Sequence, residues 1–201
     1  MEKLDLGNSD FKNIIENNNY FVDKSLFVRE IIEKQSQVIL LPRPRRFRKT
    51  LNLSMLKYYF DINQASQNNL FINLNIWKAA NEIKDKYAQY PVIFLSFKDA
   101  KEDSWELCLE KIISEISDTY SKHLYLLESS ILADHEKADY QRVTNINASN
   151  VEYQRCLKKL SEYLQRFYKQ RVVILIDEYD TPLQAGYKRY YDNVISFMRT
   201  Y

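Results

Sequence analysis

Three apolar runs, separated by long amphipathic stretches, place the strongest constraint on the fold of this chain. The runs are QVILLP at 37–42, YPVIFLSF at 90–97 and RVVILIDEYD at 171–180. Their apolar residues follow one another without the polar–apolar alternation of a half-exposed strand, so each run predicts a strand that is buried on both faces. Such strands occur mainly in parallel sheets that are covered by helices.

The stretches between these runs have the spacing of amphipathic helices. Apolar residues recur at intervals of three and four in the segments 20–34, 51–62, 104–132, 150–170 and 187–201. Strands that alternate with helices predict the α/β class, with a parallel sheet flanked by helices. Because ligands of such folds bind at the carboxyl ends of the strands, the residues that follow each run are the first candidates for a site.

Composition narrows the classes of function. A formal net charge of +2 over 201 residues gives no overall attraction to nucleic acid or membrane, so any site for an anionic partner must be local. No apolar run approaches the ~20 residues of a spanning helix, and the N-terminus does not resemble a secretory signal. Cys108 and Cys156 fit neither a disulfide framework nor a zinc pattern, and we expect buried thiols in a cytoplasmic protein.

The first candidate site follows the first apolar run, in LPRPRRFRKT at 41–50. Strand, tight loop, Lys-Thr and helix is the layout of a phosphate-binding P-loop, which requires Gly, four spacers, Gly, Lys and then Ser or Thr. Lys49 and Thr50 fit the last two positions, where lysine contacts the terminal phosphates and the hydroxyl binds Mg²⁺. Arg43 and Arg48 stand where the glycines belong, so the pattern by itself is not matched.

The second candidate site is the acidic end of the third apolar run. A buried strand that leads into Asp177 and Glu178 has the form of a Walker B strand, in which the aspartate holds the Mg²⁺ shell and the glutamate polarises the attacking water. Many buried strands end in acids, so this signal alone favours a solvated strand end. The order of the two stretches, however, is that of an additional-strand P-loop NTPase.

Four segments together resemble a known family, and they occur in its order. They are NYFVDKS, VILLPRPRRFRKTLNLSMLKYYFD, YPVIFLSFKD and VVILIDEYDTPL. They resemble the bacterial AAA-ATPase-like family, whose members often carry a C-terminal PD-(D/E)XK-nuclease-like domain. The resemblance implies one P-loop NTPase-like domain over residues 1–201. It also implies that the family domain continues beyond Tyr201, so we expect a sheet that is incomplete at the C-terminus and no nuclease-like domain.

The resemblance also implies roles for individual residues. The implied nucleotide-binding residues are Arg43, Arg45, Arg46, Phe47, Arg48, Lys49 and Thr50. The implied Mg²⁺ ligands are Thr50 and Asp177, and the implied catalytic residue is Glu178. The family loop reads like RPRRFGKT, so the arginine at position 43 is ordinary and Arg48 is the departure.

Arg48 replaces the glycine that lets the loop backbone approach the phosphates. A non-glycine residue at positive φ costs only about 1–2 kcal/mol, which a fold can absorb. A side chain in the phosphate path has a larger effect, because the backbone N–H groups can no longer close around the β-phosphate. We therefore expect weak binding of ATP with Mg²⁺ and impaired hydrolysis.

The alternative function belongs to another class. The chain would then be a non-catalytic remnant or an interaction module whose basic loop binds acidic partners or nucleic acid. A solvated basic loop is the simpler interpretation and is favoured over nucleic-acid binding. Asp180 and Thr181, which follow the acidic strand end, are open to two interpretations: contact with the metal shell, or a turn before Pro182.

Overall fold

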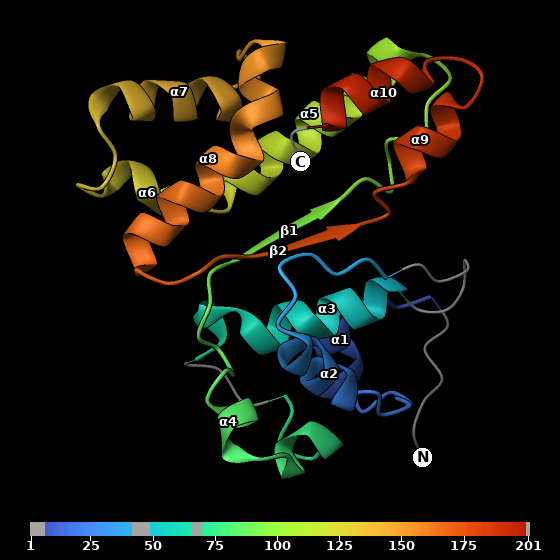
Figure 1. The fold of residues 1–201 in the computed structure, drawn as a ribbon, viewed down its shortest axis with the longest axis vertical. Coiled ribbons are helices and arrows are strands. Elements are labelled where there is room, and N and C mark those ends of the chain that lie inside the picture. Colours follow the sequence, from blue (N-terminus) through green and yellow to red (C-terminus); the bar gives the residue numbers. More distant parts are fainter. Residues whose placement is uncertain (1–6, 42–48, 66–69, 200–201) are drawn as a thin grey trace. The chain divides into compact units, whose positions relative to one another are not determined.

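The computed structural model describes residues 7–41, 49–65 and 70–199 (Figure 1). The chain folds into two compact units, Met1–Val92 and Ile93–Tyr201. Each unit is described by itself below. Within the described residues, no helix combines the length and the apolar character that are needed to cross a membrane.

The first unit is helical. Its elements are α1 (Phe11–Glu16), α2 (Leu26–Lys34), α3 (Lys49–Phe60), η1 (Ile62–Gln64), η2 (Asn75–Lys78) and α4 (Asn81–Lys84). Its core is aromatic: Phe71 stacks on Phe11 with ring centroids 4.9 Å apart and meets the edge of Tyr59 at 5.1 Å. The hydroxyl of Ser54 on α3 accepts from the Phe11 N–H at the start of α1. These contacts hold α1 against α3 and so fix the helix that begins at Lys49.

The second unit contains the sheet. Its elements are β1 (Val92–Ser96), α5 (Trp105–Ser121), α6 (Tyr125–Glu128), α7 (Asp134–Thr144), α8 (Asn150–Tyr168), β2 (Val173–Asp177), α9 (Thr181–Gly186) and α10 (Tyr191–Met198). β1 and β2 form a two-stranded sheet and run in the same direction (Figure 1). Beyond β1, the Phe97 N–H donates to the Asp177 carbonyl at 3.1 Å, so pairing continues to the carboxyl end of β2.

One edge of β1 is occupied by a side chain from a helix. In a strand, successive residues direct their backbone groups to opposite sides, so Ser96 faces away from β2 when Phe97 faces toward it. The Ser96 N–H donates to Glu115 Oε1 of α5 at 3.2 Å. Burial raises the pKa of the Glu115 carboxyl, and the bond from Ser96 lowers it in part. A charged side chain at this position protects the strand edge from pairing with another chain.

Buried tyrosines join α5, α7 and α8. The Tyr120 hydroxyl donates to the Cys156 carbonyl at 2.7 Å, and the Tyr140 hydroxyl donates to the Tyr120 carbonyl at 2.7 Å. A buried hydroxyl needs such a partner, because an unpaired one costs about 1–3 kcal/mol. Cys108 and Cys156 form no disulfide in the described part of the chain, and both are buried, as predicted.

The sequence-based prediction of the sheet is confirmed in two runs and wrong in one. The runs at 90–97 and 171–180 contain β1 and β2, and the α/β class is confirmed. The run at 37–42 was predicted to be a buried strand, but its described residues, 37–41, form none. Val38 and Leu40 are 86% and 61% exposed there. A parallel strand requires a neighbour for its backbone groups, and apolar side chains alone do not supply one.

Candidate functional site

The acidic end of β2 combines a buried carboxylate with a sharp change of chain direction. Asp177, the last residue of the strand, is only 2% exposed. The next residue, Glu178, has a φ of 50°, in the left-handed region that interrupts an extended strand. Thr181 and Pro182 then begin α9, with proline in the first turn, where its missing N–H is not needed. The sequence therefore ends the strand at the acids and restarts the chain as a helix three residues later.

Thr181 holds both the backbone and the side chain of Glu178. The Thr181 N–H donates to the Glu178 carbonyl at 3.0 Å and closes the turn. The Thr181 hydroxyl donates to Glu178 Oε2 at 3.3 Å. A left-handed conformation costs a non-glycine residue about 1–2 kcal/mol, so this turn holds a strained backbone next to a half-buried carboxylate.

Asp180 lies beside this turn with one carboxylate oxygen unsatisfied. Its Oδ2 accepts from Gln184 Nε2 at 2.6 Å. Its Oδ1 is buried and has no hydrogen-bond partner within the part of the chain that the structure describes. None of the ion pairs among the described residues involves Glu178 or Asp180. Within the described residues, therefore, neither carboxylate is paired with a cationic side chain.

Lys49 and Thr50 are the first two residues of α3, and both are half-buried. The N-terminus of a helix has unpaired backbone N–H groups and a positive dipole end, which favour anions such as phosphate. A Lys-Thr pair at this position is the arrangement that the sequence predicted. The other predicted loop residues, Arg43, Arg45, Arg46, Phe47 and Arg48, lie outside the described residues, so their roles stay predictions.

The described ranges contain no group of three or more His, Cys, Asp or Glu side chains that could bind a metal ion through protein ligands alone. Mg²⁺ does not require such a group, because it keeps several waters and binds through one or two carboxylates together with substrate phosphates. Asp177 and the Thr50 hydroxyl provide donors of the type that Mg²⁺ prefers.

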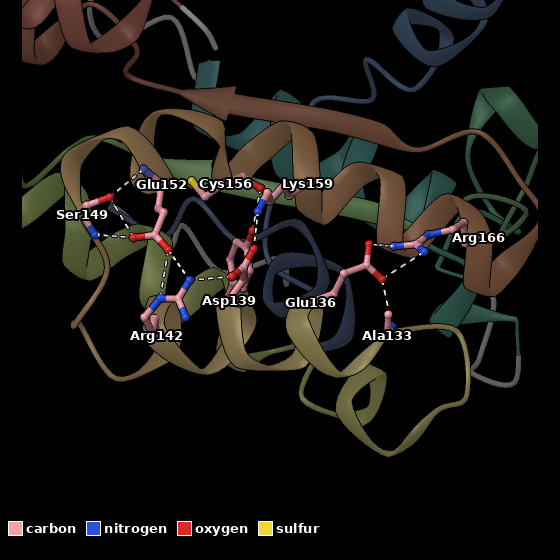
Figure 2. Close-up of polar contacts among 10 residues, drawn as sticks. Ala133, Glu136, Asp139, Arg142, Ser149, Glu152, Cys156, Lys159 and Arg166 are labelled. Carbon is pink, nitrogen blue, oxygen red and sulfur yellow. Dashed lines mark hydrogen bonds and ion pairs between the residues drawn. The ribbon is translucent and has the colours of Figure 1, made fainter.

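A second set of carboxylates, on α7 and α8, is paired with cations (Figure 2). Its ion pairs are Glu136–Arg166 at 2.8 Å, Asp139–Lys159 at 2.6 Å and Glu152–Arg142 at 2.6 Å. The backbone N–H of Ser149 and the Arg142 guanidinium lower the pKa of Glu152 to about 2. The pKa values of Glu136 and Asp139 are also lowered, chiefly by hydrogen bonds from Arg166 and Lys159.

This paired set forms a structural joint between two helices. The cavity beside it, lined in part by Asp139, Cys156 and Lys159, has a volume of about 10 Å³. That volume is near the minimum for a single water molecule and is too small for a nucleotide. The sequence analysis did not predict α7. It did predict α8, whose N-terminal capping box of Ser149 and Glu152 can be recognised in the sequence.

Comparison with known proteins identifies the family. The family model AAA-ATPase_like, described as "Predicted AAA-ATPase", matches residues 5–201. The chain therefore belongs to the AAA-ATPase-like family. It is 28% identical over 183 residues to an "Uncharacterized protein in vnfD 5'region" of Azotobacter chroococcum mcd 1, which covers 90% of this chain and 30% of that relative. The chain thus spans about 30% of the length of this curated relative. No solved structure matches the chain.

Proposed function

We propose that this protein is a P-loop NTPase that binds ATP with Mg²⁺ and hydrolyses it poorly. The observation that carries the proposal is the buried Asp177 at the carboxyl end of a parallel strand, directly before Glu178 in its left-handed turn. Carboxyl ends of parallel strands are where α/β proteins bind their ligands. Membership in the AAA-ATPase-like family over residues 5–201 supports this assignment.

The proposal gives each of these residues its own task. Lys49 contacts the terminal phosphates, and the positive dipole end at the start of α3 adds attraction for the same anion. Thr50 and Asp177 would hold Mg²⁺, which would supply charge neutralisation of the phosphates. Glu178 accepts a hydrogen bond from the attacking water and orients it. Catalysis of phosphoryl transfer consists mainly of such positioning and charge stabilisation, so each group has to be held in place.

The proposed weakness comes from Arg48 in the loop. Its side chain occupies the position at which the family loop carries glycine, and this hinders close approach of the backbone to the β-phosphate. The added cation offsets part of this loss by attracting the phosphates. We therefore expect ATP binding to persist at reduced affinity, with a larger loss in hydrolysis, which depends on accurate placement of the γ-phosphate.

Isothermal titration with Mg·ATP tests the proposal. We expect measurable, weak binding to the natural chain, tighter binding to Arg48→Gly and weaker binding to Lys49→Ala. Truncating one partner of a charged pair costs about 2–5 kcal/mol, so Lys49→Ala should lose at least roughly thirtyfold in affinity. Lys158→Ala is the matched control, because it removes the same charge from a side chain that is 76% exposed and has only a 4.0 Å ion pair.

Two results would contradict the proposed nucleotide site. If circular dichroism shows that all four proteins are folded and none of them produces heat with Mg·ATP, the chain has no nucleotide site. If Lys158→Ala weakens binding as much as Lys49→Ala does, the measured affinity comes from general charge and not from a site.

A further inference from the structure

Among the described residues, Glu178 accepts hydrogen bonds from Thr181, both through its side chain and through its backbone carbonyl. We infer that Thr181 is a positioning residue, whose hydroxyl orients the Glu178 carboxylate toward the attacking water. The inference rests on the proposed function, because it assigns a task to Thr181 only if Glu178 acts on that water. Neither the family match nor the curated relative assigns a role to Thr181.

The position of the donor, the Thr181 hydroxyl, is set by its place at the start of α9. Thr181 is the first residue of α9, and the Gln184 N–H donates to the Asp180 carbonyl at 2.9 Å to close the first helical turn. Threonine is branched at Cβ, which restricts rotation about χ1. Its hydroxyl is therefore presented in a defined direction, and the carboxylate of Glu178 is held by a group that cannot move freely.

Thr181 donates to Oε2 of Glu178. No hydrogen bond to Oε1 is found among the described residues, so Oε1 can accept one from water. A hydroxyl donor also differs from a cation in this position, because it orients the carboxylate without the strong attraction of an ion pair. Glu178 takes part in none of the ion pairs among the described residues. The carboxylate is thus held in orientation and still available as an acceptor.

The backbone turn at Glu178 does not depend on the Thr181 hydroxyl. Glu178 is one of seven non-glycine residues at positive φ in the described part of the chain, so this conformation alone does not mark a functional residue. The turn is closed by the Thr181 backbone N–H, which every substitution except proline retains. The hydroxyl is therefore not required for the turn, and its task can be tested separately.

The test compares four variants in the Arg48→Gly background, in which binding is expected to be tightest. They are Thr181→Val, Thr181→Ser, Glu178→Gln and Thr119→Val. Thr119→Val is the matched control, since the Thr119 hydroxyl is buried without a hydrogen-bond partner among the described residues. Steady-state ATP hydrolysis gives kcat and KM, titration with Mg·ATP gives Kd, and thermal unfolding reports on stability.

We expect Thr181→Val to lower kcat about tenfold, with KM and Kd unchanged, because misplacement of a catalytic group slows chemistry without weakening binding. Thr181→Ser should restore most of kcat, and Thr119→Val should leave it unchanged. Glu178→Gln should bind Mg·ATP and hydrolyse none of it.

Three results would overturn the inference, and each is distinguishable from failure of the proposed function. The first is that Thr181→Val hydrolyses ATP at the parent rate. The second is that Thr181→Val loses kcat, affinity for Mg·ATP and thermal stability together and that Thr181→Ser does not restore them, which would indicate a structural effect. The third is that the parent binds Mg·ATP without hydrolysing it, so that Glu178 does not orient a water for attack. Absence of Mg·ATP binding in the parent refutes the proposed function and, with it, the task assigned to Thr181.

Discussion

The second unit contains two sets of carboxylates that differ in whether they form ion pairs with described residues. On α7 and α8, Glu136, Asp139 and Glu152 each meet a lysine or arginine at 2.8 Å or less. At the end of β2, Glu178 and Asp180 take part in no ion pair among the described residues. Glu178 lies in a strained backbone turn, and Asp180 has a buried oxygen that finds no hydrogen-bond partner in the described ranges.

This difference distinguishes carboxylates that stabilise the fold from carboxylates that are available to bind a ligand. A carboxylate with a lowered pKa and a cation partner stabilises the fold, and it has little capacity left for a ligand. A carboxylate that has only a hydroxyl or amide donor retains acceptor capacity at the cost of local stability. Natural proteins tolerate such costs chiefly at functional sites. The acids at the end of β2 fit that description, and the acids of the α7–α8 joint do not.

Lowering the pH should produce the largest change in unfolding free energy, because it protonates the paired carboxylates of the α7–α8 joint. The folded-state pKa of Glu152 is about 2, below its ordinary 4.5, so its contribution to stability is fully present above pH 4.5 and is lost as pH falls toward 2. The lowered pKa values of Glu136 and Asp139 act in the same direction. The raised pKa of Glu115 acts in the opposite direction, since protonation removes its burial cost.

Because the three joint carboxylates are partly exposed, we expect a combined loss of about 2 kcal/mol in unfolding free energy between pH 4.5 and 2. Urea unfolding at several pH values measures it. Glu152→Gln should flatten the profile, and Glu178→Gln should leave its shape unchanged. An identical profile for all three proteins would show that the joint does not couple to pH.

Removing the strain at Glu178 should stabilise the fold and abolish hydrolysis. Glu178→Gly relieves the left-handed strain and should raise the unfolding free energy by about 1 kcal/mol. Lys169→Gly is the matched control, because Lys169 ends α8 at a φ of 54°, away from the candidate site. It should stabilise by a similar amount and leave ATP turnover unchanged. If Glu178→Gly is destabilising, the glutamate side chain contributes more to the fold than our comparison allows.

One substitution, Asp→Asn, should have different effects in the two regions. Asp139→Asn weakens the pairs with Lys159 and Arg142 and should destabilise by about 0.5–1 kcal/mol, the range for partly exposed pairs. Asp180→Asn removes a partly buried charge that has no cation partner in the described residues, so the unfolding free energy should stay the same or rise slightly. Chemical denaturation of both variants checks the difference. Equal losses would mean that Asp180 is a structural residue like Asp139.

The sequence predicts elements that depend on local pattern and misses features that depend on distant partners. β1 and β2 follow from continuous apolar runs that pair with each other. The run at 37–42 has the same pattern, but strand formation requires a neighbour, and the described residues 37–41 have none. Helix α7 has only two buried residues, Tyr140 and Val143, so its apolar stripe is too thin to recognise.

The candidate site shows the same division. Residue type and order predict that Lys49 and Thr50 lie at a helix start and that Asp177 and Glu178 lie at a strand end, and the structure has them there. Their roles in a nucleotide site stay predictions. The left-handed turn at Glu178 is not predictable, because glutamate has no preference for positive φ. The bond from Thr181 depends on that turn and is visible only in three dimensions.

The most direct test of the account is paramagnetic broadening of backbone amide signals by Mn²⁺·ATP in the Arg48→Gly chain. Mn²⁺ takes the place of Mg²⁺ and broadens signals of nearby amides. We expect strong broadening at Lys49 and from Asp177 to Thr181, and none at Glu136, Asp139 or Glu152, whose carboxylates are already paired. Broadening at the α7–α8 acids, or none at Asp177–Thr181, would contradict the claim that the end of β2 is the nucleotide-metal site of this protein.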